Sequence, residues 1–143
     1  MFTGHRSGLL QTWSLTGKRL LELQGHAADV ICVHFTLEGD KLASCCRAGS
    51  VRVWNVSTGE CLGVREFGDG AISSLSLSST GLLALTICDG NSLVVTKTGE
   101  PLETVKLNCM TIDRPVRVCI CPGPAGQTVY VTSLDGWLGT LTM

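Results

Sequence analysis

Hydrophobic residues along the chain fall into short segments that are rich in Val, Ile, Leu and Thr. Gly, Asp and Ser separate these segments, as they do where turns join strands. The pattern therefore predicts an all-β chain of short strands rather than helices. The predicted strands are Arg19–Leu23, Val30–Phe35, Lys41–Ser44, Val51–Trp54, Cys61–Arg65, Ile72–Leu77, Leu82–Thr86, Leu93–Thr96, Pro101–Leu107, Val116–Ile120, Thr128–Thr132 and Trp137–Leu141. The Pro- and Gly-rich residues 122–126 are predicted to form a surface loop.

The same arrangement of residues recurs along the chain. Trp13 and Trp54 lie about 40 residues apart, and each is followed by a Thr-Gly pair that occurs a third time at residues 98–99. Asp89 and Asp135 each precede a glycine in the later copies. Each copy is expected to fold into one four-stranded antiparallel unit. The predicted boundaries are a partial unit at 1–17 and repeats at 18–59, 60–100 and 101–143.

The stretch from Gly25-His26 to Trp54-Asn55 carries the residues of a known repeat signature. A period of about 40 residues with a Gly-His pair and a later Trp resembles the WD-repeat β-propeller family, although Asn55 replaces the usual Asp. The resemblance covers about three repeats and a partial one. It implies an all-β partial β-propeller over residues 1–143, an open arc of four-stranded antiparallel blades.

In the WD-repeat family a His, a Ser or Thr, an Asp and the Trp form a hydrogen-bonded structural tetrad. The resemblance assigns His26, Ser44 and Trp54 to this tetrad, whereas Ala48 stands at the position of the Asp. We therefore expect a network that lacks the acceptor for His26. Because a buried Trp needs a partner for its one donor, the Trp54 indole N–H is predicted to point toward Ser44 or His26.

The number of repeats also predicts an open arrangement. Propellers close with about four to eight blades, so three repeats and a partial one are expected to leave two bare ends. We expect a piece of a larger propeller, a short isoform or a fragment of a multidomain protein, and the sequence does not reveal the parent or the total blade number. The apolar residues expected to be exposed there, and to drive self-association, are Leu9, Leu10 and Trp13 at one end and Val118, Ile120 and Val131 at the other.

Charge and hydropathy narrow the range of partners. Eleven Lys and Arg face twelve Asp and Glu without a long single-sign run, so nucleic acid is not expected as a primary partner. The longest apolar stretches, 82–85 and 116–120, are too short to span a membrane. The first residues lack the features of a secretory signal. We expect an intracellular protein, cytoplasmic or nuclear, without a membrane partner.

The chain has eight cysteines, which lie within apolar segments. Cysteines in such positions are expected to be buried, reduced thiols. A closed zinc site usually needs two Cys-x-x-Cys pairs, and neither Cys45-Cys46 nor Cys119-Ile120-Cys121 has that spacing. We therefore expect no structural metal and no cofactor.

Candidate catalytic side chains form no recognisable constellation. His26 belongs to the Gly-His pair, His34 lies in a predicted strand, and the acidic residues fall in turns. No Gly-x-Ser-x-Gly nucleophile elbow occurs, so we expect no catalytic residue and no enzyme activity. The alternative is a blade fragment of a propeller hydrolase, or the regulatory WD region of a larger enzyme such as a nucleotide-switch ATPase. A phosphate loop of the Gly-x-x-x-x-Gly-Lys type, which would support the latter, is absent from the sequence.

The resemblance also implies where partners bind. In WD propellers, proteins dock on the residues that flank the first inner strand and on the residue before the turn Asp. An exposed Ile31 beside Arg47 would have the aliphatic and arginine character of interface anchors. We therefore expect a scaffold for protein–protein interaction, whose partner the sequence does not identify. The candidate protein-binding residues are Asp29, Ile31, Arg47, Ser73 and Arg117.

Overall fold

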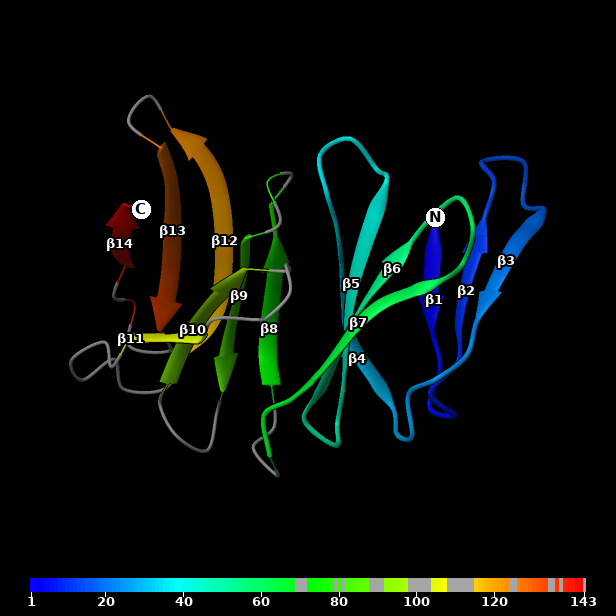
Figure 1. Ribbon diagram of the computed structural model, residues 1–143, viewed down its shortest axis with the longest axis horizontal. Helices are drawn as coiled ribbons and strands as arrows, with labels where there is room; N and C mark the ends of the chain where they lie inside the picture. Colours follow the sequence, from blue (N-terminus) through cyan, green and yellow to red (C-terminus); the bar gives the residue numbers. More distant parts are fainter. Residues whose placement is uncertain are drawn as a thin grey trace. The chain divides into compact units, whose positions relative to one another are not determined.

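The computed structural model of the chain contains strands and no helix among the residues that it describes. These residues are 1–68, 72–78, 80, 82–87, 92–97, 104–107, 115–123, 126–133, 136 and 138–142. The repeat landmarks Asp89, 98–99 and Asp135 lie outside them. Within the described set, no helix is long and apolar enough to cross a membrane. The chain divides into two compact units, Met1–Asp69 and Gly70–Met143, and Figure 1 shows the strands of each.

The first unit contains two antiparallel sheets whose strands follow one another in chain order. Short turns cause this order. The Ser14 N–H, for example, donates to the Lys18 carbonyl at 2.8 Å, and the Asn55 N–H donates to the Glu60 carbonyl at 2.9 Å. The three-stranded sheet consists of β1 (Phe2–Gly4), β2 (Leu10–Trp13) and β3 (Arg19–Leu23). The four-stranded sheet consists of β4 (Val30–Phe35), β5 (Lys41–Cys46), β6 (Ser50–Asn55) and β7 (Cys61–Glu66).

The second unit also contains one four-stranded and one three-stranded antiparallel sheet. The first has the order β11-β10-β9-β8 and the second the order β12-β13-β14. The four-stranded sheet consists of β8 (Ile72–Leu77), β9 (Leu82–Ile87), β10 (Ser92–Lys97) and β11 (Thr104–Leu107). The three-stranded sheet consists of β12 (Pro115–Gly123), β13 (Gly126–Ser133) and β14 (Leu138–Thr142).

The expectation that each sequence repeat folds into one sheet is wrong. β3, the first strand of the repeat at 18–59, pairs with β2, which belongs to the predicted partial repeat at 1–17. β7, from the next repeat, completes the sheet of β4, β5 and β6. The tight turn between β2 and β3 keeps these strands adjacent, whereas the longer segment 24–29 leads to the next sheet. The sequence repeat and the sheet are therefore offset by one strand.

Strand limits follow the hydrophobic pattern closely, since β3, β4 and β8 begin and end where predicted. The predicted loop at 122–126 is an exception. β12 continues to Gly123 and β13 begins at Gly126, and these two residues are paired. Gly123 and Gly126 thus belong to paired strands, which the composition alone does not distinguish from a longer loop.

Each unit buries its own hydrophobic cluster. The cluster of the first unit consists of Leu10, Leu23, Leu42 and Trp54. The cluster of the second unit consists of Leu93, Val95, Val118, Val129 and Val131. The expectation that Leu10, Val118 and Val131 are bare is wrong, because they are 0%, 6% and 3% exposed. The two sheets of each unit cover one another's apolar faces, so these residues are buried within the unit.

The described cysteines carry free thiols with very different exposure. The expected burial is confirmed for Cys45 and Cys46 but is wrong for Cys119, which is exposed. The reason is strand parity. Val118 points into the core, so Cys119, its neighbour on β12, points to the opposite face of the sheet.

Candidate protein-interaction surface

Three connecting segments of the first unit gather at one end of its sheets, the lower end in Figure 1. They are His5–Leu9 between β1 and β2, the segment 24–29 between β3 and β4, and Arg47–Gly49 between β5 and β6. Backbone hydrogen bonds join them. The Val30 N–H donates to the His5 carbonyl at 3.2 Å, and the Arg47 N–H donates to the Asp29 carbonyl at 2.9 Å. The end of the unit is therefore a continuous surface rather than three separate loops.

A β-bulge shapes this surface at the start of β4. The ladder between β4 and β5 shifts register between Val30 and Cys32, which leaves Ile31 as the extra residue. A bulge re-aims a side chain out of the regular alternation, and Ile31 is 40% exposed. The ladder between β8 and β9 shifts in the same way at Ser73. The bulge is thus a repeated feature of these strands.

The side chains of Asp29 and Arg47 form an exposed ion pair beside Ile31. The Arg47 Nε lies 3.7 Å from the Asp29 Oδ2, and the two side chains are 72% and 37% exposed. Such a pair contributes at most about 1 kcal/mol in water, so Arg47 can turn to another carboxylate at little cost. We name the surface of Asp29, Ile31 and Arg47 the docking surface.

Ser73 and Arg117 lie in the second unit, and both are exposed. The Val118 N–H donates to the Ser74 hydroxyl at 3.2 Å. Ser73 and Arg117 directly precede the two residues of this hydrogen bond, on β8 and β12, which belong to different sheets. The structure therefore brings Asp29, Ile31 and Arg47 together in the first unit, whereas Ser73 and Arg117 lie on different sheets of the second unit.

A buried hydrogen-bonded network lies behind the docking surface. Trp54 is 2% exposed, and its Nε1–H donates to the Ser44 hydroxyl at 2.8 Å. The same hydroxyl lies 2.7 Å from the His26 Nε2, and the rings of His26 and Trp54 meet edge-on with centroids 6.3 Å apart. The prediction for the Trp54 indole N–H is confirmed. The network ties β5 and β6 to the segment that precedes β4.

The expectation that this network lacks a partner for the other nitrogen of His26 is wrong. The hydroxyl of Ser50, at the start of β6, lies 3.2 Å from the His26 Nδ1. Because the Trp54 indole only donates, Ser44 can give its own proton to Nε2, and Nδ1–H then donates to Ser50. The sequence feature that could have predicted this contact is the hydroxyl of Ser50, two residues after Ala48. It takes the place of the carboxylate expected at position 48.

The surroundings of His26 keep it neutral. Burial, and to a smaller extent the charge of Arg52, lowers the pKa of His26 from 6.5 to about 4. The Arg52 guanidinium lies over the Trp54 ring, 5.9 Å from its centroid. A Cβ atom at Gly25 would lie 3.0 Å from the Arg52 Nη1 and 3.2 Å from the Trp54 ring. Glycine before His26 therefore leaves the space that this arrangement of arginine, tryptophan and histidine needs.

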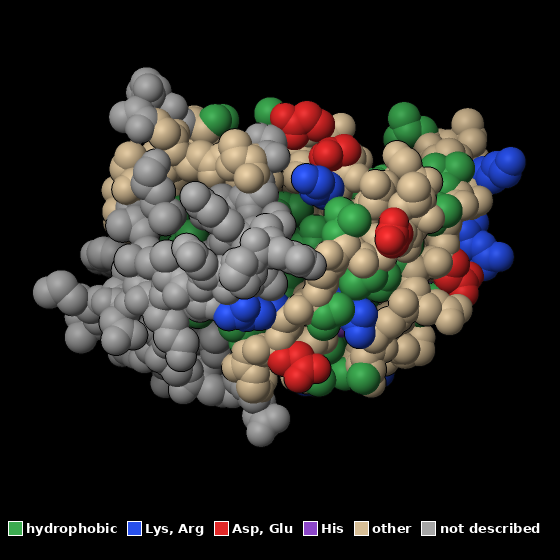
Figure 2. Space-filling model, viewed as in Figure 1, with side chains coloured by type: hydrophobic (Ala, Val, Ile, Leu, Met, Phe, Trp, Pro, Cys, Tyr) green, Lys and Arg blue, Asp and Glu red, His purple; other side chains and the backbone are tan. Residues whose placement is uncertain are grey.

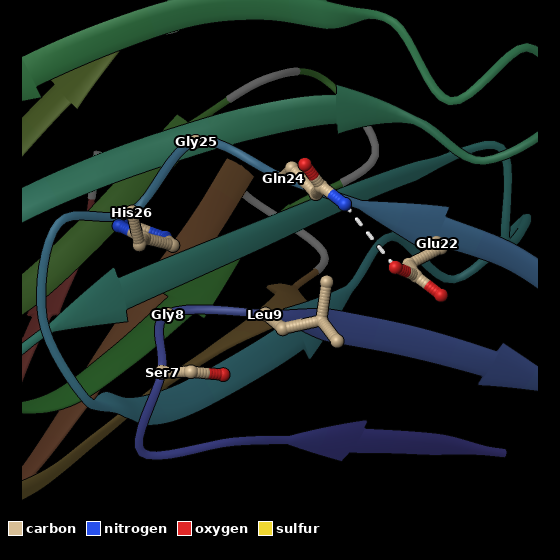
Figure 3. A pocket seen from close by; sticks show the side chains of 7 residues that line it. All are labelled: Ser7, Gly8, Leu9, Glu22, Gln24, Gly25 and His26. Carbon is tan, nitrogen blue, oxygen red and sulfur yellow. Dashed lines mark hydrogen bonds between the residues drawn. The ribbon is translucent and has the colours of Figure 1, made fainter.

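An open pocket of about 350 Å³ adjoins the network, and Figure 3 shows its lining. The lining residues are Ser7, Gly8, Leu9, Glu22, Gln24, Gly25 and His26. A carboxylate and a histidine in one pocket are the groups that a hydrolase would use. Here both ring nitrogens of His26 are bonded, and Glu22 accepts from Gln24 at 3.2 Å and pairs with Arg19 at 3.2 Å. This arrangement does not favour the catalytic alternative, because His26 is 6% exposed and the Ser44 hydroxyl bonded to it belongs to a residue that is 0% exposed.

Residues 17–55 match the family described as WD domain, G-beta repeat. These residues are a WD repeat. They include the Gly-His pair, Ser44 and Trp54, so the hydrogen-bonded network belongs to the matched repeat. The resemblance to WD-repeat propellers is confirmed.

Relatives of known name match different lengths of the chain. Eukaryotic translation initiation factor 3 subunit I of Meyerozyma guilliermondii is 31% identical over 132 residues, 87% of this chain and 35% of the relative. The subunit of the same name from Aspergillus terreus is 40% identical over 76 residues, 52% of this chain and 22% of the relative. The sterol regulatory element-binding protein cleavage-activating protein of Xenopus laevis is 48% identical over 44 residues, 29% of this chain and 3% of the relative. The chain thus spans about a third, or less, of the length of these relatives.

A solved structure shows the same fold. The β-propeller domain of Cps50 (Swd1) from Myceliophteria thermophila aligns with a TM-score of 0.78 at 16% identity. The alignment covers 99% of this chain and 49% of that chain. The fold is therefore that of a partial β-propeller, as the repeat pattern predicted.

Proposed function

We propose that the chain is a non-catalytic scaffold that binds other proteins through the docking surface. The observation that carries this proposal is the exposed Ile31, which the bulge turns outward beside the weak Asp29–Arg47 pair. An aliphatic anchor next to an arginine that is free to change partners is typical of a protein interface. Two of the relatives are named as subunits of a translation initiation factor, which supports a role in an assembly.

The chemistry of the surface defines the partner that it fits. Figure 2 shows acidic and basic side chains interspersed with hydrophobic ones over the described part of the visible face. A partner would place an apolar side chain on Ile31 and a carboxylate on Arg47, and Ser73 and Arg117 would serve the same role in the second unit. The balanced charge supports a protein partner over nucleic acid or a membrane surface, at an intracellular site that is cytoplasmic or nuclear.

Replacing Ile31 and Arg47 together by alanine is expected to weaken partner capture strongly while leaving the fold intact. Both side chains are exposed, so the free energy of unfolding should change by less than about 1 kcal/mol. Loss of two interface anchors should weaken binding at least tenfold, the equivalent of about 1.4 kcal/mol. The measurement is affinity purification of the tagged chain followed by quantitative mass spectrometry of the captured proteins.

The matched control replaces Leu37 and Glu38 by alanine. These residues form the turn between β4 and β5, at the opposite end of β4, and Leu37 is 86% exposed. The control should retain the wild-type captured proteins. Equal capture by the Ile31/Arg47 variant and the wild type would remove the docking surface from consideration.

We also propose that the isolated chain associates with itself through β1 and β14. Within the described residues, β1 and β14 are edge strands with one neighbour each, as are the other outermost strands of the four sheets. Unpaired strand edges recruit further strands, and Leu138 in β14 is 61% exposed. Size-exclusion chromatography with light scattering at micromolar concentration should show species larger than 15.1 kDa. A monomer that melts cooperatively would contradict this proposal.

A further inference from the structure

Cys119 and Cys121 place two thiols side by side on one face of β12. Residues two apart in a strand point to the same face, and the two Sγ atoms lie 3.8 Å apart. Cys119 is exposed and Cys121 is half-buried, whereas Val118 on the opposite face is buried. Both thiols of the pair are therefore open to solvent on the outer face of the sheet.

The separation of the two sulfur atoms fits a shared metal ion. Two zinc–sulfur bonds of about 2.3 Å at a tetrahedral angle place their sulfur atoms about 3.8 Å apart. The observed distance already has this value, so the two side chains need no rearrangement to bind one ion. A two-point ligand that is already in position loses little conformational entropy on binding.

The geometry of Cys119 and Cys121 fits a disulfide less well than it fits a shared metal ion. It needs Cα atoms about 4.4–6.8 Å apart and sulfur atoms about 2.05 Å apart. Residues two apart in a strand have Cα atoms about 6.6–6.8 Å apart, at the upper limit of that range. The strand therefore favours a bridge through a third atom over a direct sulfur–sulfur bond.

The neighbouring side chains leave the remaining coordination positions open. Tyr130 lies opposite Cys119 and Thr128 opposite Cys121 in the ladder between β12 and β13, and neither is a preferred zinc ligand. Among the residues with described positions, no group of three or more His, Cys, Asp or Glu side chains gathers here. Two ligands would come from the described residues and the others from outside them, such as water or another molecule, unlike a closed four-ligand structural site.

We propose that Cys119 and Cys121 form an open two-thiolate site for a thiophilic divalent cation of the Zn²⁺ type. On binding, each thiol loses one proton and forms one metal–sulfur bond, so that one ion replaces two protons. Burial and the adjacent Cys121 raise the pKa of Cys119. The Cys119 thiol therefore has to lose its proton for a metal ion to bind. The site lies in the second unit and does not depend on the docking surface of the first.

The test uses Cd²⁺ as the probe, because cadmium–thiolate bonds absorb in the ultraviolet. Titration of the full chain, reduced with a phosphine, should give a saturable band at one Cd²⁺ per chain. C119S and C121S should each weaken binding at least tenfold, since either change removes half of the chelate. The control variant C61S, which alters a half-buried thiol on β7, should bind Cd²⁺ as the wild type does.

A second measurement locates the ion without any substitution. Alkylation of the wild-type chain, followed by peptide mass spectrometry, should show that Cd²⁺ protects Cys119 and Cys121 and that a chelator removes this protection. The proposal is overturned if the double variant C119S/C121S keeps wild-type affinity, or if Cd²⁺ fails to protect both thiols. Circular dichroism of each variant checks that the strands are retained.

Discussion

Replacing Trp54 by alanine is expected to lower the free energy of unfolding by about 3–5 kcal/mol. The side chain is 2% exposed, and it packs in the cluster with Leu10, Leu23 and Leu42 that joins the two sheets of the first unit. Its removal leaves a cavity and also takes away the donor to Ser44. The measurement is denaturant unfolding followed by circular dichroism, since the substitution removes a fluorescent reporter.

The variant W54F separates packing from hydrogen bonding. Phenylalanine retains an aromatic ring but has no N–H for Ser44, so we expect a smaller loss of about 1–2 kcal/mol. The exposed-site variant L15A, in which the side chain is 101% exposed, should unfold as the wild type does. A loss below about 1 kcal/mol for W54A would show that Trp54 does not anchor the two sheets.

Acid is expected to destabilise the first unit through His26, by about 1–3 kcal/mol between pH 6.5 and 4. The pKa of His26 falls from 6.5 to about 4 on folding, mainly because of burial and then because of Arg52. The folded state thus binds fewer protons than the unfolded chain. The contribution of His26 is fully present above pH 6.5 and is lost as the pH falls toward 4.

The control for this pH dependence is H26Q, which has no titrating group at the site. Glutamine should lower stability at neutral pH, because the contacts with Ser44 and Ser50 are disturbed, but it should flatten the curve between pH 6.5 and 4. Carboxylates titrate in both proteins, so the difference between the two curves isolates His26. Parallel curves would contradict the buried, neutral state of this histidine.

The sequence by itself determined the local structure and the repeat. Short apolar segments separated by Gly, Asp and Ser define strands, and the limits of β3, β4 and β8 follow from them. The Gly-His pair and the later Trp predicted a WD repeat at 18–59, and the family match covers residues 17–55. The contact between Trp54 and Ser44 was also predictable, because a buried indole needs an acceptor.

Only the tertiary structure decided which strands share a sheet and which faces are covered. β3 joins the sheet of β2, and Leu10 is buried between two sheets of one unit. Ser50 reaches His26 because the register of β6 against β5 places it there. Cys119 is exposed because its neighbour Val118 takes the core face. Periodicity records only the local alternation of side chains, whereas partner strands and buried faces depend on contacts between residues far apart in the chain.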